Sequence, residues 1–274
     1  MKFDVELVGK IGSMALVDEQ HGELDYNKFV RISRFLRPGM IWVSSGATVI
    51  GRLDYLRRTG KELDGAMEDV KADYAAQGQA ILMQTYRNFI DNAYSVRQVL
   101  LEHNHFNDEV KREHIKNLLL RCKEQNAIPI INYNDCVSSE ENRKWEIEKL
   151  HRQQEKVVEL VDNDETAAQV ACLVKSKLLV ILTNLDGIYR DVHDPSTLIR
   201  EISGKNVQEV LANIDETKKL CEGASRVGAN GAKAKLEYIK PCVENGTKVI
   251  IASSRYDLED IVDGKVPCTV ISAR

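Results

Sequence analysis

The sequence predicts an α/β fold in which helices cover both faces of a mainly parallel β-sheet. Segments with strand-like apolar runs alternate with segments of helical apolar spacing along most of the 274 residues. This alternation is typical of parallel strands that are connected by helices. The strand-like runs, such as LLVIL at Leu178–Leu182, are apolar without interruption, which indicates burial on both faces. We therefore expect a three-layer α/β/α sandwich.

In the first half of the chain, glycines and prolines separate the predicted elements. The first strand ends in glycines, and the first helix stops before Pro38–Gly39, because proline cannot continue a helix. The predicted strands are Val5–Gly12, Met40–Ser45, Val96–Leu101 and Ile128–Asn132. The predicted helices are Tyr26–Leu36, a helix after Gly46 through Arg58, Gly65–Asn88 and Asp108–Gln125.

A polar stretch, Ser138–Leu160, interrupts this alternation, and we interpret it as an exposed excursion: a lid, a subunit contact or a surface insertion. The alternation then resumes, and Asn184–Pro195 has the composition of a turn or hairpin. The later predicted helices are Thr166–Lys175, Lys205–Asn213 and Ala232–Asn245, and the strands are Leu178–Thr183, Lys248–Ser253 and Cys268–Ser272. Without an obvious linker, we expect a single domain over 1–274, with an N-terminal lobe of about 1–165 and a C-terminal lobe of about 166–274.

Composition excludes several classes of protein. The net charge of −4 argues against a nucleic-acid partner. The N-terminal stretch contains acidic residues, unlike a signal peptide, and the apolar runs are too short to span a membrane. Six cysteines without a C-x-x-C pair indicate reduced thiols of a cytoplasmic protein and no metal or disulfide framework.

Glycine-rich turns follow two of the predicted strands. GKIGS contains Lys10 and ends the first strand, and SSGA covers Ser44–Ala47 after the second. In open α/β sheets, ligands bind beyond the carboxyl ends of the strands. Each turn could present backbone N–H groups to an anion or simply connect a strand to a helix. GANGAKAK, at Gly228–Lys235, could likewise cradle phosphate before a helix or form a flexible loop.

The polar residues near these turns suit phosphoryl transfer. That chemistry needs cations on the transferring group, backbone donors around the phosphates and carboxylates that hold the cations or Mg²⁺. Lys10, Lys235, Asp135 and Asp164 could supply the charged groups. Capping of a helix N-terminus is the alternative role for Asp164. No H-E-x-x-H or G-x-S-x-G pattern supports hydrolysis.

Taken in order, these motifs resemble the amino-acid kinase superfamily, and within it the glutamate 5-kinases. The resemblance rests on GKIGSMAL, WVSSGATVIGR, AAQGQAILMQTY, VRQVLLE, IPIINYNDCVS, VDNDETAAQVA, LLVILTNLDGIYRDVHDP and GANGAKAK. It covers the chain from about Val5 to Ser253. It implies the carbamate kinase-like fold and ATP-dependent phosphorylation of L-glutamate to L-glutamyl 5-phosphate, the first step of proline biosynthesis. Mg²⁺ is then expected mainly on the ATP phosphates, with no protein ligand assigned.

The resemblance also implies roles for individual residues. Lys10 and Lys235 are expected to contact the transferring phosphoryl group and the nucleotide phosphates, and Asp164 is expected to orient both lysines. The expected substrate-binding residues are Ser45, Gly46, Ala47, Asp135 and Asn163. The expected nucleotide-binding residues are Gly12, Ser13, Thr183, Asn184, Tyr189, Gly228, Asn230, Gly231 and Lys235. Lys233 has no matching role and is expected to be solvated.

Departures from the family pattern keep two alternatives open. The stretch between Asp135 and Asp162 is longer than in the family, and Asn230 and Ala232 replace a glycine and a methionine. The acceptor could therefore be another amino acid, N-acetylglutamate, a nucleoside monophosphate or an isoprenoid phosphate. A phosphate acceptor needs extra cations near SSGA, where only Arg52 is close. The protein could also bind nucleotides or anions without catalysis. We expect a homo-oligomer, a dimer or a tetramer, and no C-terminal PUA domain.

Overall fold

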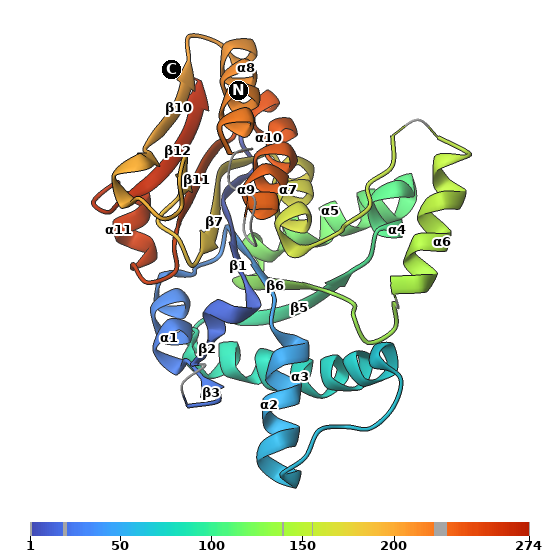
Figure 1. Ribbon diagram of the computed structural model, residues 1–274. Coiled ribbons are helices and arrows are strands. Elements are labelled where there is room, and N and C mark those ends of the chain that lie inside the picture. The colour runs from blue at the N-terminus through green and yellow to red at the C-terminus, as the bar shows by residue number, and fades with distance from the viewer. Residues whose placement is uncertain (1, 19–20, 139, 155, 222–228, 274) are drawn as a thin grey trace. The chain divides into compact units, whose positions relative to one another are not determined.

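The computed structural model in Figure 1 describes every residue except 1, 19–20, 139, 155, 222–228 and 274. The chain forms two compact units. Unit 1 contains Met1–Ile11, Gly39–Trp42 and Asp164–Arg274, and unit 2 contains Gly12–Pro38 and Val43–Asn163. The chain enters unit 1 for the last time at Asp164. Unit 1 also includes two N-terminal segments that we had expected in the other lobe.

The strands hydrogen-bond in the order β10-β12-β11-β7-β1-β4-β6-β5. In unit 1, β1 (Val5–Ile11), β7 (Ser176–Thr183) and β11 (Lys248–Ser253) are parallel neighbours. β12 (Cys268–Ala273) runs antiparallel to β11 and parallel to β10 (Glu201–Gly204). This confirms the predicted mainly parallel sheet with flanking helices.

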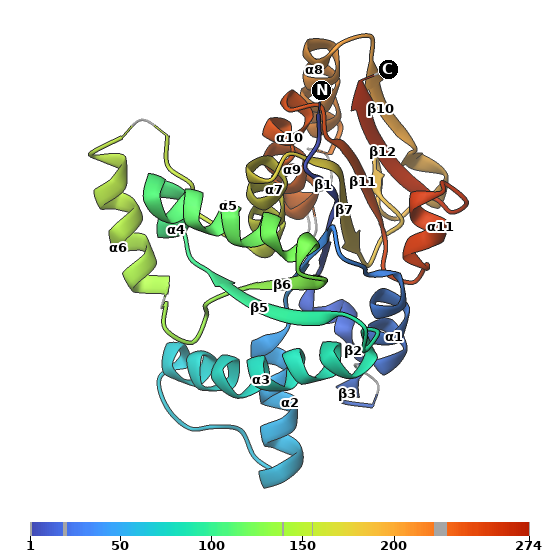
Figure 2. The same ribbon diagram turned by 180° about the vertical axis from the view of Figure 1, so that it is seen from behind.

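The helices of unit 1 lie on both sides of its strands. They are α7 (Asn163–Leu173, of which Asn163 itself belongs to unit 2), α8 (Val207–Leu220), α9 (Ala229–Tyr238), α10 (Lys240–Glu244) and α11 (Leu258–Val262). Figures 1 and 2 show α8 and α10 on one side of β11 and β12 and α11 on the other. Within the core, Trp42 fills the space above Gly9, where an added Cβ would meet the indole ring.

Unit 2 has the same layered arrangement around β5 (Ser95–Leu101) and β6 (Ala127–Tyr133), which are parallel. β4 (Met40–Ser44) contributes its last two residues to this unit. Figures 1 and 2 show α2 (Ala47–Thr59) and α3 (Met67–Phe89) on one side of these strands. α4 (Asn104–Asn107) and α5 (Glu109–Glu124) lie on the other side.

Small elements complete unit 2. They are the 3₁₀ turn Ser13–Leu16, the hairpin of β2 (Val17–Asp18) and β3 (Glu23–Leu24), and α1 (Tyr26–Phe35). Asp25 caps α1 by accepting a hydrogen bond from the Lys28 N–H, which satisfies one of the unpaired donors at a helix start. Phe29 of α1 packs edge-to-face on Tyr86 of α3, with ring centroids 5.0 Å apart.

Two glycines allow α2 and α3 to cross at backbone contact. A Cβ added to Gly51 would lie 1.8 Å from the Tyr74 carbonyl oxygen, and one added to Gly78 would lie 1.8 Å from the Ala47 carbonyl oxygen. No side chain fits at such distances, so glycine is required at both positions. This crossing holds the start of α2, which carries the SSGA turn.

Some elements differ from the prediction. The excursion contains a helix, α6 (Glu140–His151), which its polar composition did not indicate. The helix expected over Ala232–Asn245 is two helices, α9 and α10, because Pro241 begins a new first turn. α8 extends beyond Asn213 to Leu220. The segment expected as a turn or hairpin over Asn184–Pro195 contains β8 (Ile188–Tyr189), which pairs with β9 (Leu198–Ile199) beyond that segment. Within the described residues, no helix is long and apolar enough to cross a membrane.

Candidate functional site

The carboxyl ends of three parallel strands lie at one edge of unit 1. Lys10 is the next-to-last residue of β1 and pairs with Ile181 of β7. Thr183 ends β7 and pairs with Ser253, which ends β11. Because the strands are parallel, these residues share the edge at which α/β proteins bind ligands.

Asp164 joins the two predicted catalytic lysines. Its Oδ1 atom lies 2.6 Å from the Nζ of Lys10, and its Oδ2 atom lies 2.9 Å from the Nζ of Lys235. The exposed fractions of these side chains are 5% for Asp164, 10% for Lys10 and 20% for Lys235. Residues from a strand, α7 and α9 thus meet in one largely buried charged cluster, which we call the lysine–aspartate cluster.

The electrostatics of this cluster favour an anionic ligand. Burial alone would raise the pKa of Asp164, but the two neighbouring ammonium groups outweigh it and hold the pKa below its usual value. The carboxylate is therefore ionised at neutral pH. Two positive charges and one negative charge leave a net positive charge of one, which suits the developing charge on a transferring phosphoryl group.

The segment GANGAKAK is helical where the structure describes it. Gly228 lies outside the described residues, and α9 begins at Ala229, so Asn230 and Gly231 belong to its first turn and do not form the expected loop. Lys235 reaches back along this helix, and its Nζ donates to the Gly231 carbonyl at 3.4 Å. Among the described residues of this segment, the interpretation as a phosphate-binding segment therefore rests on Lys235.

The expected base and ribose positions follow β7. The Thr183 hydroxyl donates to the Leu185 carbonyl at 2.8 Å and thereby closes the turn after the strand. Asn184 is exposed. Tyr189 donates to Asp186 at 3.4 Å, and Asp186 pairs with Arg255 at 2.6 Å. A nucleotide role for Thr183, Asn184 and Tyr189 stays a prediction.

In unit 2, Asn163 connects two predicted strand ends. Its amide nitrogen donates to the Ser45 hydroxyl at 2.8 Å and to the Asn132 side-chain oxygen at 3.1 Å. Asn132 in turn donates to Gln79 at 2.9 Å. The Asn163 Oδ1 atom is buried and has no hydrogen-bond partner among the residues that the structure describes. An unpaired buried acceptor is costly, so this oxygen is well suited to receive a donor from a ligand.

The SSGA turn is held in a conformation that favours glycine. Gly46 has φ of 114°, in the left-handed region that residues with a Cβ rarely adopt, and it caps the start of α2, whose first residue is Ala47. Ser13 lies beside this turn, with its Cα 3.8 Å from the position of a Cβ on Gly46. Gly12 precedes the 3₁₀ turn with φ of −78°, which any residue can adopt.

Asp135 lies beside Ala47, Gln79 and Tyr133 at a cavity of about 10 Å³. A cavity of this size has room for about one water molecule, so it is not a preformed acceptor pocket. Burial raises the pKa of Asp135 to about 6, and the nearby Arg143 partly opposes this. Because Asp135 is nevertheless exposed as a residue, water limits how far its pKa can rise.

Sequence reasoning missed Asn132, Gln79 and Arg143. Asn132 and Gln79 occur in the motifs IPIINYNDCVS and AAQGQAILMQTY without an assigned role, although their amides position Asn163. Arg143 belongs to the excursion helix α6, yet its guanidinium lies 5.8 Å from the Tyr133 ring centroid and donates to the Leu160 carbonyl at 3.1 Å. Its place in a polar run contained no signal of this contact. Within the described residues, no three His, Cys, Asp or Glu side chains are grouped as a metal site would need.

Comparison with curated proteins places these features in a family. The sequence profile of the amino acid kinase family matches residues 6–253. The chain is 29% identical to the glutamate 5-kinase of Streptococcus suis, over 92% of this chain and 65% of that protein. It is 30% identical to glutamate 5-kinase 2 of Bacillus subtilis, over 93% and 64%, so it spans about two thirds of the length of these relatives. It is 29% identical to the glutamate 5-kinase of Clostridium perfringens, over 100% and 97%.

Solved structures show the same fold at low sequence identity. Carbamate kinase from Giardia lamblia bound to AMP-PNP has a TM-score of 0.60 and 16% identity, covering 98% of each chain. The isopentenyl phosphate kinase of T. acidophilum has a TM-score of 0.56 and 14% identity, covering 98% of this chain and all of the other. With its lysine–aspartate cluster, its mainly parallel sheet and a profile match over most of its length, the chain belongs to the amino acid kinase family.

Proposed function

We propose that this protein transfers the γ-phosphoryl group of ATP to a carboxylate, with L-glutamate as the acceptor and an acyl phosphate as the product. The observation that carries the proposal is the lysine–aspartate cluster, in which Asp164 holds Lys10 and Lys235 at 2.6 and 2.9 Å. Phosphoryl transfer needs positioned positive charge more than it needs covalent chemistry from the protein. Glutamate 5-kinases among the relatives support the choice of acceptor.

Each lysine has a separate task in this proposal. Lys10 lies near the end of β1, where it would stabilise charge on the transferring group, and Lys235 would contact the phosphates of the bound nucleotide. Asp164 would keep the two ammonium groups from repelling each other. MgATP supplies the phosphoryl group and neutralises part of its charge. Asp164 would act as a positioning residue, since its carboxylate holds the lysines.

Unit 2 supports an amino-acid acceptor. The buried Oδ1 of Asn163 could accept a hydrogen bond from the ammonium group of the amino-acid substrate. The carboxylate of Asp135 could form an ion pair with the same ammonium group. Ser45 is placed by its hydrogen bond from Asn163. An amide oxygen and a carboxylate both accept hydrogen bonds, and an ammonium group offers only hydrogen-bond donors. The two side chains are therefore suited to bind the ammonium group of an amino acid.

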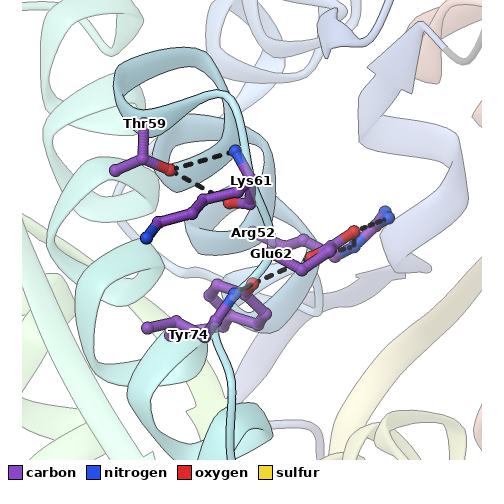
Figure 3. Close-up of polar contacts among 6 residues, drawn as sticks. Arg52, Thr59, Lys61, Glu62 and Tyr74 are labelled. Atoms are coloured by element: carbon purple, nitrogen blue, oxygen red, sulfur yellow. Dashed lines mark hydrogen bonds and ion pairs between the residues drawn. The ribbon is translucent and has the colours of Figure 1, made fainter.

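A substrate that carries a phosphate group is less well supported, because Arg52, the cation expected to bind that phosphate, is already paired with a carboxylate. Figure 3 shows Arg52 beside Glu62, with the Arg52 Nε donating to Glu62 at 2.9 Å. The Tyr74 hydroxyl donates to the same carboxylate at 2.8 Å and accepts a hydrogen bond from the Leu63 N–H at 2.7 Å. Arg52 is thus paired with an anchored carboxylate, which favours a carboxylate acceptor over a nucleoside monophosphate or isoprenoid phosphate.

The test is ADP release from MgATP with L-glutamate in the presence of hydroxylamine, which traps an acyl phosphate as a hydroxamate. Glutamate-dependent ADP release with a matching yield of hydroxamate would establish the proposed reaction. ADP release with uridine monophosphate or isopentenyl phosphate, and none with glutamate, would replace glutamate by that acceptor. ATP binding without turnover on any acceptor would favour a non-catalytic nucleotide-binding role.

A further inference from the structure

Two cysteines of unit 1 are in contact although they are far apart in the sequence. Cys172 lies in the last turn of α7 and Cys242 lies in α10, and their Sγ atoms are 3.1 Å apart. The Cys242 thiol also lies 3.2 Å from the Ala168 carbonyl oxygen. Both residues are free thiols. The scattered cysteine spacing in the sequence did not indicate this contact.

The geometry suits bond formation between the two sulfur atoms. A disulfide bond measures about 2.05 Å, so the sulfurs need to approach by about 1 Å from their separation of 3.1 Å. Cys242 is fully buried, whereas Cys172 is partly exposed. A small oxidant can therefore reach Cys172 first, and Cys242 is already in place beside it.

We propose that Cys172 and Cys242 are an oxidation site, at which a peroxide converts the two thiols of the folded protein into a reversible disulfide. The Cys172 thiolate attacks one peroxide oxygen, the O–O bond breaks, and a sulfenic acid and hydroxide form. The Cys242 sulfur then attacks the sulfenic sulfur, the S–S bond forms, and the S–O bond breaks. The departing hydroxide takes up the Cys242 proton as water. In total, two thiols and one hydrogen peroxide give one disulfide and two waters.

The hydrogen bond between the thiols favours this order of events. The hydrogen bond between the two thiols lowers the pKa of the Cys172 thiol and raises the pKa of the Cys242 thiol well above its usual value. The thiolate is the reactive form of cysteine. Cys172 is therefore the attacking group and Cys242 the resolving group.

The disulfide would connect elements next to the lysine–aspartate cluster. α7 carries Asp164 in its first turn and Cys172 in its last, and α10 directly follows α9, which carries Lys235. The bond would therefore restrain α7, which supplies Asp164, and α10, the helix directly after the one that supplies Lys235. The oxidation itself does not depend on the proposed kinase reaction, and only this consequence does.

The test uses the full chain in its folded state, treated with a few equivalents of hydrogen peroxide, blocked with a thiol-alkylating reagent and digested without reduction. We expect mass spectrometry to find a peptide pair joined through Cys172 and Cys242 that separates after reduction by a dithiol. The same treatment in concentrated urea should give a mixture of linkages among the six cysteines. A circular dichroism spectrum that the peroxide treatment leaves unchanged shows that the native sample stayed folded.

Single cysteine variants test which sulfur atoms form the bond. Cys172→Ser should abolish the linkage and leave Cys242 reduced, and Cys242→Ser should leave Cys172 as a sulfenic acid that a dimedone probe labels. Cys136→Ser removes the other partly exposed cysteine and should not change the linkage. The proposal is overturned if wild-type Cys172 stays reduced or stays a sulfenic acid without linkage. It is equally overturned if the folded protein links other cysteines as readily as this pair.

Discussion

The Nζ atom of Lys10 lies 2.6 Å from the Oδ1 atom of Asp164, and both side chains are almost completely buried. Two charged groups in such a place must each be compensated, because burial penalises the charged form. The second oxygen of Asp164 holds Lys235 in the same way. The arrangement concentrates positive charge at the carboxyl ends of the strands, where the proposed phosphoryl transfer needs it.

Replacing the bridging carboxylate should damage both activity and stability. In Asp164→Asn, two lysines lose their counter-charge, so we expect kcat to fall by about 10²-fold or more and the free energy of unfolding to fall by about 3–5 kcal/mol. Because the folded-state pKa of Asp164 is lowered, its contribution to stability is present above the usual carboxyl pKa and is lost as pH falls through the folded-state value. ADP release and urea denaturation at several pH values measure these effects. Asp263→Asn, at an exposed pair with Lys265, is the control, and equal losses in both variants would contradict the prediction.

The two lysines of GANGAKAK should differ sharply in importance. Lys235→Ala removes a group held by Asp164, and we expect kcat to fall by about 10²-fold or more because a charge contact in the transition state is lost. Lys233→Ala, two positions earlier on α9, should leave kcat within about twofold. Lys10→Ala should resemble Lys235→Ala. Steady-state ADP release compares all three, and a Lys10 or Lys235 variant within twofold of the wild type would remove that residue from the mechanism.

Acceptor use should depend on the ionisation of Asp135. Its pKa is raised to about 6, and only the carboxylate can pair with an ammonium group, so kcat/KM for L-glutamate should rise with pH through about 6 and then level off. Asp135→Asn should lower kcat/KM and flatten this profile. With a raised folded-state pKa, Asp135 contributes stability below its usual pKa and loses it as pH rises through about 6. The variant should therefore be at least as stable as the wild type at pH 7, and an unchanged pH profile would contradict the role of Asp135.

The excursion helix α6 should affect the binding of the acceptor substrate and not the binding of the nucleotide. Arg143 of α6 faces the Tyr133 ring and influences Asp135, so Arg143→Ala should raise KM for L-glutamate several-fold with little change in KM for ATP. Arg152→Ala, in the exposed segment after α6, is the matched control. Deletion of 138–160 should change KM for the acceptor in the same direction. An unchanged acceptor KM in both variants would mean that the excursion is a surface insertion with no part in acceptor binding.

The helix crossing in unit 2 predicts a stability effect that needs no assumption about function. In Gly78→Ala, the new Cβ would lie 1.8 Å from the Ala47 carbonyl oxygen, so α2 and α3 must move apart. Overpacking of this kind costs about 1–3 kcal/mol, or more when backbone must shift. Urea denaturation should therefore show a lower midpoint. Ala80→Gly, on the same helix, tests the loss of helix propensity alone, for which about 1 kcal/mol is expected, and a Gly78→Ala variant as stable as the wild type would contradict the crossing.

Local patterns in the sequence were sufficient for most elements. Apolar runs predicted β1, β4, β6, β7, β11 and β12, because a strand buried on both faces is mostly apolar, and β5 was also predicted although most of its residues are not buried. Helical spacing predicted α1, α2, α3, α5 and α7 in the same way. The strand β10 and helix α11 are short and were missed, since so few residues establish no period. α6 was missed because its polar surface contains no clear apolar stripe.

The sequence by itself determined the fold class, the family and the position of the candidate site residues at the ends of strands. These follow from residue types in a fixed order. Only the tertiary structure decided that Asp164 holds both lysines, that Asn132 and Gln79 position Asn163, and that Cys172 meets Cys242. Those contacts join residues that lie far apart in the chain. They depend on how helices and strands are oriented in each unit, and local periodicity contains no information about side chains that approach from different elements.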